Sequence, residues 1–205
     1  MSSLREIRAE ETRSRLLGAA RELFTEHGYA HTTTEQLVQR AGVTRGALYH
    51  HFESKLAIFD ALLIELEQGF IATVRRIASP DAPAWTNLVT GCHAFLDSCL
   101  RPDVQRLALI DGPAVLGPAR WREIEDQYAL VPVLNGLTGS MSEGTVAPRP
   151  PESLARMLLA AINEAGLIIA QSPRPREARQ EADDAFDALL HGLRRAPGSD
   201  AAQAR

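Results

Sequence analysis

Apolar residues recur at helical spacing along most of the chain. The first apolar face consists of Leu16, Leu17, Ala20, Leu23 and Phe24. Charged residues occupy the positions between them, which is typical of an amphipathic helix. Gly28 follows and predicts the carboxyl end of this helix, because glycine favours the position after the last turn. The sequence has no alternating apolar and polar run flanked by hairpin glycines, so the pattern predicts an all-α fold.

Two short helices joined by a tight turn are predicted next. Thr33 and Gln36 have the spacing of a capping box, which predicts a helix over residues 35–41. A glycine at position 42 ends it, and Thr44 is a suitable cap for a second short helix over residues 45–51. An amphipathic helix followed by two short helices around a glycine-containing turn is the pattern of a helix-turn-helix unit.

The rest of the chain predicts a larger set of helices. After a long helix capped by Ser54, helical segments are expected at residues 84–100, 104–110, 113–116, 119–137, 152–171 and 176–195. Proline and glycine predict breaks at residues 101–102, 111–113, 117–118 and 142–151. The small and polar tail at residues 196–205 is expected to be disordered.

The second short helix carries side chains suited to reading DNA. The residues expected to pack inward are Val38, Val43, Leu48 and Phe52. The outward and amino-terminal positions hold Thr44, Arg45, Gly46, Tyr49 and His50. In a recognition helix these positions meet the major groove. Arg45 can bridge a guanine through two hydrogen bonds, and Gly46 lets the backbone approach the bases closely.

Several residues around this helix can contact the DNA backbone. Thr34, Thr44, Tyr49 and His50 carry hydrogen-bonding groups of the kind that contact phosphate. Lys55 lies at the start of the next helix, where a cation gains nothing from the helix dipole. An external anion, namely a DNA phosphate, therefore explains a lysine at this position.

These residues together resemble the DNA-binding signature of TetR-family transcriptional repressors. The shared pattern is Thr32-Thr-Thr-x-x-Leu37-Val-x-x-Ala41-Gly-Val43-Thr-x-Gly46-Ala-Leu48-Tyr-x-His51-Phe-x-Ser54-Lys55. The upstream residues Ala20, Phe24, Gly28 and Tyr29 belong to the same match, which covers roughly residues 12–60. Many fixed spacings agree at once, so the resemblance is specific.

The resemblance implies a fold and a function. It implies a three-helix DNA-binding domain at residues 1–52 and a ligand-binding and dimerisation domain of about six helices at residues 53–205. Members of the family bind a palindromic operator as homodimers and release it when a small molecule binds. By this match Thr34, Thr44, Tyr49, His50 and Lys55 would contact phosphates, and Arg45 and Gly46 would reach bases. His51 would either touch phosphate or fix the turn into the next helix.

Large apolar residues of the second domain are candidates for an effector pocket. They are Phe70, Trp85, Cys92, Phe95, Leu96, Trp121 and Tyr128. Core packing is the alternative, because an ordinary core needs the same residue types. Asp111 precedes Gly112 and Pro113, so it is expected to cap a helix, with a ligand cation as the alternative partner. His93 is expected to be solvated.

The last two predicted helices are expected to form a homodimer interface. The residues proposed for it are Leu154, Leu158, Ala161, Ala165, Ile168, Phe186, Leu189, Leu190 and Leu193. Two helices from each subunit would make a four-helix bundle, whereas completing the monomer core is the alternative. Asn163 and Glu164 lie within the same apolar segment and could serve a ligand, the register of a dimer, or solvent.

Composition and charge narrow the function classes. The 205 residues carry a formal net charge of −4, with 45% hydrophobic and 23% charged residues, which excludes disorder throughout and a basic coat for nucleic acid. The charge is uneven, because residues 1–52 hold seven Arg against six Glu, while the remainder holds 15 basic and 20 acidic residues. Lys55 is the only lysine in the sequence.

The sequence also predicts a cytoplasmic protein without a membrane segment. No apolar export segment follows Met1, and no uncharged run of about 18 strongly apolar residues occurs. Cys92 and Cys99 stand seven positions apart in a helical pattern, roughly 10 Å along the axis, which is too far for a disulfide. With no Cys/His cluster nearby they predict no zinc site, and inert buried thiols are favoured over a redox sensor. No cofactor is indicated.

Two other function classes remain as alternatives. The acidic pairs Asp183-Asp184 and Glu125-Asp126 are typical of solvated helix faces, and no nucleophile with a base and an orienting group is evident. A glycine-rich phosphate loop after a strand is also missing, so an enzyme is disfavoured. A helical module whose helix-turn-helix packs against protein is the third class, and it would show no salt-dependent binding of DNA.

Overall fold

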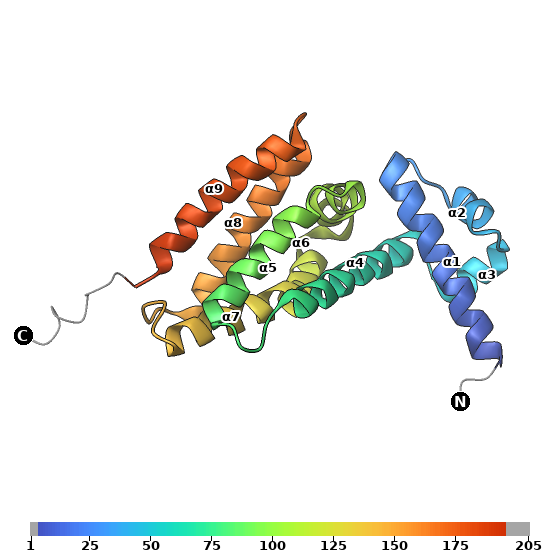
Figure 1. Cartoon of the computed structure of the whole chain (residues 1–205). Coiled ribbons are helices and arrows are strands. Elements are labelled where there is room, and N and C mark those ends of the chain that lie inside the picture. Colours follow the sequence, from blue (N-terminus) through green and yellow to red (C-terminus); the bar gives the residue numbers. More distant parts are fainter. Residues whose placement is uncertain (1–3, 196–205) are drawn as a thin grey trace, which may run out of the picture. The chain divides into compact units, whose positions relative to one another are not determined.

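The computed structural model describes residues 4–195, which fold almost entirely into helices (Figure 1). The elements are α1 (Leu4–His27), α2 (Thr34–Ala41), α3 (Arg45–His51), α4 (Lys55–Ile77), α5 (Ala84–Ser98), the π-helical segment η1 (Val104–Asp111), α6 (Gly112–Glu125), a second π-helical segment η2 (Asp126–Leu130), α7 (Val131–Ser142), α8 (Pro151–Gln171) and α9 (Pro175–Leu193). This confirms the all-α prediction. The tail expected at residues 196–205 lies outside the described residues.

The contacts divide the chain into two compact units. Unit 1 comprises residues 1–69 and 101–122, and unit 2 comprises residues 70–100 and 123–205. The helices α4 and α6 each contribute residues to both units. The sequence places the domain boundary after residue 52. Unit 1 extends beyond this boundary, because it also includes the first part of α4 and the segment 101–122.

Unit 1 is built on an aromatic cluster. The ring centroid of Phe24 lies 5.6 Å from that of Tyr29 and 5.6 Å from that of Phe59, and Tyr29 and Phe59 are 5.2 Å apart. Tilted and edge-to-face contacts at such distances are the favoured arrangements of aromatic pairs. Burial raises the pKa of the Tyr29 hydroxyl. The cluster joins α1 to α4 through the turn that follows Gly28.

Unit 2 is a bundle in which α5, α7, α8 and α9 pack against one another. Small residues allow α7 to approach α5 closely: a Cβ atom added at Gly139 would lie 2.7 Å from the Cβ of Ala84. The fully buried side chains of the bundle include Leu96, Leu137, Ile162, Ile169 and Phe186. Their removal from water supplies the main stabilising free energy of this unit.

Two predicted features of the chain near Asp111 are wrong. The sequence predicts a break at residues 111–113 and a capping role for Asp111. Instead, Gly112 has helical dihedrals (φ −53°, ψ −59°), so η1 continues into α6. The predicted break at residues 117–118 is present, because Gly117 leaves the helical region at φ 77° and ψ 164° directly before Pro118. A positive φ of this size is accessible to glycine at little cost.

Of the two acidic pairs expected to be solvated, Glu125-Asp126 has partners in the fold, whereas Asp184 of the other pair is exposed. Asp126 Oδ1 accepts a hydrogen bond of 2.7 Å from Arg156, and Glu125 Oε1 accepts one of 2.6 Å from the amide of Asn163. Asn163 thus has a partner in its own chain, whereas Glu164 is exposed. The role in contact with solvent therefore fits Glu164. Asn163 instead makes a hydrogen bond within unit 2, which is none of the three roles considered.

Both cysteines are free thiols in the interior of unit 2. Burial raises the pKa of Cys92 and of Cys99 to about 12 in each case. Since the thiolate is the form that reacts with oxidants and disulfides, both thiols are held in the unreactive form at neutral pH. These positions favour inert core thiols over a redox sensor.

One described helix, α8, has the length and composition of a membrane span. Its most apolar window has a mean hydropathy of 1.5, and 33% of that window is buried inside the fold. Length and composition alone are weak evidence, because the core helix of a soluble bundle meets the same criteria. Here α8 packs against α5, α7 and α9.

Candidate nucleic-acid interface

The pair α2 and α3 forms through local capping signals. Thr33 accepts a hydrogen bond from Gln36 N (3.2 Å), and the Gln36 side chain accepts one from Thr33 N (2.8 Å), which completes a capping box. Gly42 takes the left-handed conformation (φ 61°) that closes α2. Thr44 accepts from Ala47 N (3.1 Å) and starts α3. The predicted turn and both short helices are confirmed to within one residue.

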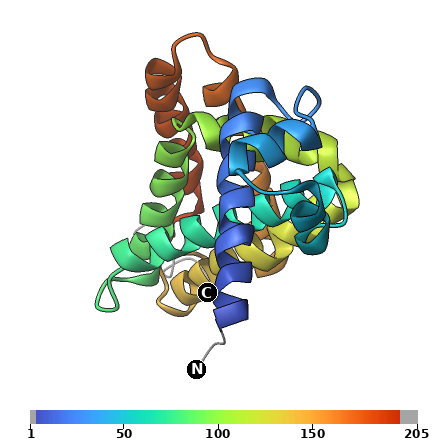
Figure 2. The same cartoon turned by 90° about the vertical axis from the view of Figure 1, so that its right-hand side faces the viewer.

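The first helix holds this pair in place, as the two views of α1, α2 and α3 show (Figures 1 and 2). Leu37 and Leu48 are fully buried, and Phe52 is buried beneath the guanidinium of Arg13, which lies 5.1 Å from the ring centroid. Arg15 donates to the carbonyl oxygens of Ala41 (2.6 Å) and Gly42 (2.7 Å). Sequence reasoning missed Arg15, although the unsatisfied carbonyls at the end of any helix require such donors.

The outer surface of α3 presents the side chains expected to meet DNA. Arg45 is 68% exposed at its side chain, and Tyr49 is 44% exposed. Thr44, Gly46 and His50 are also exposed. His51 is half-buried beside His50, with the ring centroids 5.3 Å apart. Thr34 lies at the start of α2, where its hydroxyl donates to Glu35 (3.3 Å).

Gly46 faces open space on this surface. A Cβ atom added at Gly46 would have only the Thr44 hydroxyl oxygen nearby, at 4.0 Å. Packing within the chain therefore does not require glycine here, although glycine inside a helix costs about 1 kcal/mol relative to alanine. The small residue leaves the backbone of α3 open to close approach from outside.

Arg45 rests against an acidic neighbour in the free protein. Its guanidinium lies 3.3 Å from Glu35 Oε1 and 5.6 Å from the ring centroid of Tyr49. The pKa of the Glu35 carboxyl is lowered, chiefly by a hydrogen bond from the backbone amide of Glu35 and also by Thr34 and Arg45. Exposed pairs of this kind contribute little to stability, so Arg45 can exchange Glu35 for another acceptor at low cost.

Lys55 has internal partners in addition to the external anion that the sequence predicts for it. Its ammonium donates to the carbonyl oxygens of Tyr29 and Thr32, both at 2.8 Å, and lies 4.1 Å from the Tyr29 ring centroid. Partial burial lowers its pKa. Lys55 thereby ties the start of α4 to the turn between α1 and α2.

Asp111 holds the same turn from η1. Its carboxylate accepts hydrogen bonds from Tyr29 N (3.0 Å) and from Arg106 Nε (3.1 Å). The proposed helix cap is therefore wrong, because Asp111 Oδ2 accepts from a distant backbone amide and an arginine. A ligand cation as a partner of Asp111 stays a prediction. Gly28 is favoured here because its φ is +78°, and an added Cβ would also displace the Arg106 guanidinium, which would lie 2.0 Å away.

Replacing Lys55 with Met should destabilise the free protein. The variant removes the donor to two backbone carbonyls and keeps most of the aliphatic stem, so we expect a loss of about 1–3 kcal/mol in the free energy of unfolding. Urea denaturation of wild type and K55M measures it, and R5M on the exposed start of α1 is the control. A pure phosphate contact would instead leave stability unchanged and reduce the salt slope of DNA binding by about one.

The effector-pocket candidates fall in different units. Phe70 and Phe95 meet edge-to-face in unit 2 with ring centroids 5.8 Å apart, and Cys92 and Leu96 are buried beside them on α5. Trp85 and Tyr128, also in unit 2, are half-buried. Trp121 belongs to unit 1, where a Cβ added at Gly112 would lie 2.7 Å from its ring. Trp121 is thus the one candidate assigned to unit 1, near the point where α6 passes into unit 2.

The predicted dimer residues divide into buried and exposed groups. Leu158, Ala165, Phe186 and Leu190 are buried inside unit 2, which favours the alternative that they complete the core of the single chain. Leu154, Ala161 and Leu193 are half-buried, while Ile168 and Leu189 are 51% and 56% exposed. Sequence reasoning missed Met157, which is 71% exposed. Helical periodicity could not find the outer side, because α8 is apolar on most of its circumference.

Comparisons with known proteins agree with this geometry. Residues 16–62 match the model of bacterial regulatory proteins of the tetR family, and residues 85–193 match the tetracyclin repressor-like C-terminal domain. The HTH-type transcriptional regulator SrpR of Pseudomonas putida is 49% identical over 55 residues, which are 27% of this chain and 26% of that protein. UidR of Escherichia coli K12 is 36% identical over 67 residues, which are 33% of this chain and 34% of that protein.

A solved structure extends the likeness to the whole chain. A TetR-family transcriptional regulator from Pectobacterium atrosepticum is 30% identical, with a TM-score of 0.81 over 96% of this chain and 100% of that chain. The matched segments of SrpR and UidR, by contrast, span only about a quarter to a third of those proteins. The family models cover both the helix-turn-helix and most of the residues that follow it. The chain belongs to the TetR family of transcriptional regulators.

Proposed function

We propose that this regulator is a ligand-responsive repressor that binds a palindromic operator as a homodimer and is released by a small-molecule effector. The observation that carries the proposal is the outer surface of α3. A rigidly capped helix presents Arg45 and Tyr49 to solvent beside Gly46, whose Cβ position is open. This is the arrangement that a recognition helix needs in the major groove.

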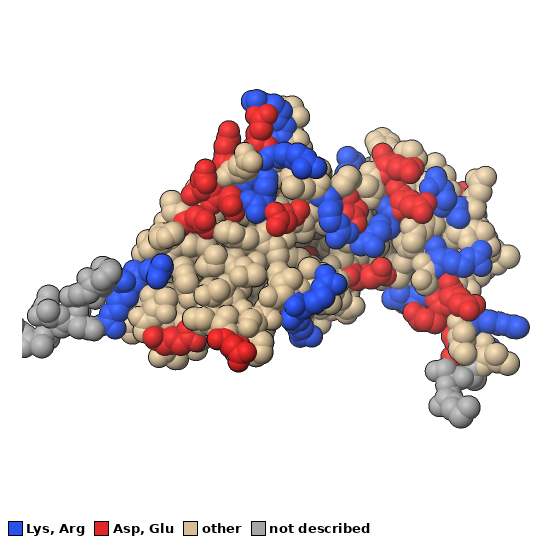
Figure 3. Space-filling model, viewed as in Figure 1, with Lys and Arg blue, Asp and Glu red and all other residues tan. Residues whose placement is uncertain are grey.

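The roles of the DNA-facing residues follow from their chemistry. Arg45 would bridge a guanine, with the backbone at Gly46 close to the bases. Thr34, Thr44, Tyr49 and His50 would donate to phosphates. His51 is half-buried, which favours a role in fixing the turn before α4 over a phosphate contact. The visible surface of unit 1 carries both basic and acidic side chains (Figure 3). We therefore expect contact with DNA at the surface around α3 rather than across a uniformly basic face.

A second copy of the chain is the partner proposed for α8 and α9. Met157 and Ile168 on α8 and Leu189 on α9 each expose more than half of their surface. Ala160, Ala185 and Ala188 are exposed on the same two helices. A two-fold dimer would place two recognition helices about 34–36 Å apart, which is why a palindromic operator is proposed.

The effector would act through α4. This helix carries Lys55 at its first residue and Phe70 in its later turns, so it links the turn at Tyr29 to the pocket candidates of unit 2. A ligand that prefers a dimer with different spacing of its recognition helices must weaken DNA binding. By linkage, DNA must weaken the binding of that ligand equally.

A cytoplasmic location without a membrane anchor is part of the same proposal. The free thiols of Cys92 and Cys99 fit a reducing compartment. The apolar surfaces of α8 and α9 are assigned to the second copy rather than to lipid.

Selection of operators from random DNA by the full-length protein tests this function. We expect enrichment of a palindrome, binding that falls steeply with salt, and lower reporter transcription when the operator overlaps a promoter. A subsequent screen of small molecules for release of that DNA tests the effector. Absence of salt-dependent binding would favour a protein-binding module instead, and raised transcription would contradict repression.

A further inference from the structure

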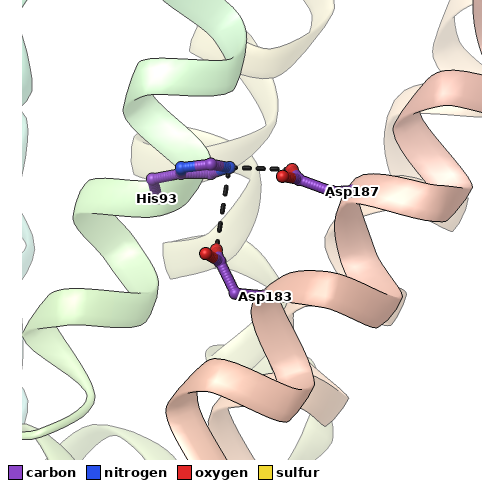
Figure 4. A group of neighbouring side chains, drawn as sticks. All are labelled: His93, Asp183 and Asp187. Carbon is purple, nitrogen blue, oxygen red and sulfur yellow. Dashed lines mark hydrogen bonds and ion pairs between the residues drawn. The ribbon is translucent and has the colours of Figure 1, made fainter.

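A histidine and two aspartates converge on the outer part of unit 2. His93 on α5 points toward Asp183 and Asp187 on α9, which are one helical turn apart (Figure 4). His93 Nε2 lies 2.8 Å from Asp187 Oδ1 and 3.7 Å from Asp183 Oδ1. The three potential ligand atoms all lie within 4.8 Å of one another. His93 was expected to be solvated, but its side chain is 33% exposed and has acidic partners.

The surroundings of this cluster carry excess negative charge. Arg179 contacts Asp97 Oδ1 at 3.0 Å and Asp183 Oδ1 at 2.9 Å, so one guanidinium is shared by two carboxylates. The contact of Asp187 in this group is with His93. Acidic side chains also gather over α9 in Figure 3. A further positive charge between His93 and the two aspartates would balance this group.

Asp183 supplies an independent indication. Its Oδ1 atom is buried, and no hydrogen bond in the described part of the chain satisfies it, because Arg179 approaches without hydrogen-bond geometry. The charge of Arg179 at 2.9 Å offsets part of the cost of burying this oxygen, but the oxygen still lacks a hydrogen bond. The same oxygen faces His93 Nε2, so a ligand bound between them would satisfy it.

The donor set identifies the ligand. One imidazole nitrogen and two carboxylate oxygens suit a divalent first-row transition metal such as Zn²⁺, which binds nitrogen and oxygen at about 2.0–2.2 Å. In a tetrahedral site with bonds of this length, the ligand atoms are separated by roughly 3.3–3.6 Å. The observed separations of 2.8 and 3.7 Å lie on either side of that range. Partial exposure of all three side chains leaves room for water to complete the coordination.

We propose that His93, Asp183 and Asp187 form a binding site for a divalent first-row transition-metal ion that ties α5 to α9. Two carboxylates and one neutral imidazole would compensate the charge of the ion. Asp97, through Arg179, would help to orient Asp183, as groups beyond the direct ligands commonly do. The site involves no residue assigned to DNA or to the dimer surface, so it stands independently of the proposed function.

Zinc titration of the full chain tests the proposal. After removal of metal with a chelator, isothermal titration calorimetry should show one Zn²⁺ site per chain that is lost, or weakened at least about tenfold, in H93Q and in D187N. Mg²⁺ should not compete, because it prefers an all-oxygen shell. Excess Zn²⁺ should raise the melting temperature of wild type by several degrees and leave both variants unchanged.

Two matched variants control for zinc bound elsewhere. H191Q removes an exposed histidine from α9, the helix that carries Asp183 and Asp187. D184N removes the exposed carboxylate next to Asp183. Both should retain the site. Circular dichroism in chelator establishes that each variant is folded, and D187N can keep a hydrogen bond to His93 if H93Q weakens the bundle. Equal zinc affinity in wild type, H93Q and D187N, or no site in wild type, would overturn the proposal.

Discussion

Replacing Leu189 with Glu should convert the protein to a monomer and nearly abolish operator binding. The side chain is 56% exposed on α9, so a charge there costs the monomer little but would be buried uncompensated in the dimer. Loss of the second recognition helix removes the gain from bivalent binding, and we expect operator affinity to fall about 10²–10⁴-fold. Light scattering at micromolar concentration measures the mass, and fluorescence anisotropy measures the affinity.

V131E is the matched control for this change. Val131 is 51% exposed in the same unit but begins α7 instead of lying on α8 or α9. The control should remain dimeric with unchanged operator affinity. Thermal unfolding should show that both variants are folded. A dimeric L189E, or a wild type that is monomeric at micromolar concentration, would exclude this surface as the interface.

Replacing Arg45 with Ala should weaken operator binding and relax its specificity at one base pair. Loss of two hydrogen bonds to a guanine costs about 1–3 kcal/mol, which corresponds to roughly 5–150-fold in affinity. The fold should persist, because within residues 4–195 the contacts of the Arg45 guanidinium are those with Glu35 and the Tyr49 ring on the protein surface. Competitive binding to operators substituted at each position locates the relaxed base pair.

R40A provides the comparison for R45A. Arg40 is an arginine in the last turn of α2 that is less exposed than Arg45 and is paired with Glu22 and Glu26 on α1. Its loss should leave base preference unchanged. An unaltered operator preference in R45A, or the same relaxation in R40A, would contradict the guanine contact.

The helix-turn-helix could be predicted from sequence almost residue by residue because its signals are local. The capping box of Thr33 and Gln36, the left-handed glycine at 42 and the cap at Thr44 act within a few positions of one another. The same short spacings define the family signature. The exposure of Arg45, Tyr49 and His50 could also be predicted from sequence, since helical periodicity places them on a different side of the helix from the buried Leu48.

Long-range partners could not be predicted. Lys55 donates to carbonyls more than 20 positions earlier, and Asp111 accepts from a backbone amide 82 positions away. Backbone atoms leave no trace in the residue pattern, so the sequence did not indicate the internal partners of Lys55 and predicted a helix cap for Asp111 that is wrong. His93 and Asp187, 94 positions apart, are brought together in the same way.

The sequence by itself determined the all-α class, the family and the bounds of α3, because caps, turns and helical periodicity are encoded over short distances. Only the tertiary structure decided which side of α8 and α9 remains exposed, since α8 is apolar on most sides and burial depends on which neighbours cover it. It also decided what the polar groups at Lys55, Asp111 and His93 contact. Those contacts depend on the packing of distant segments, which no local pattern specifies.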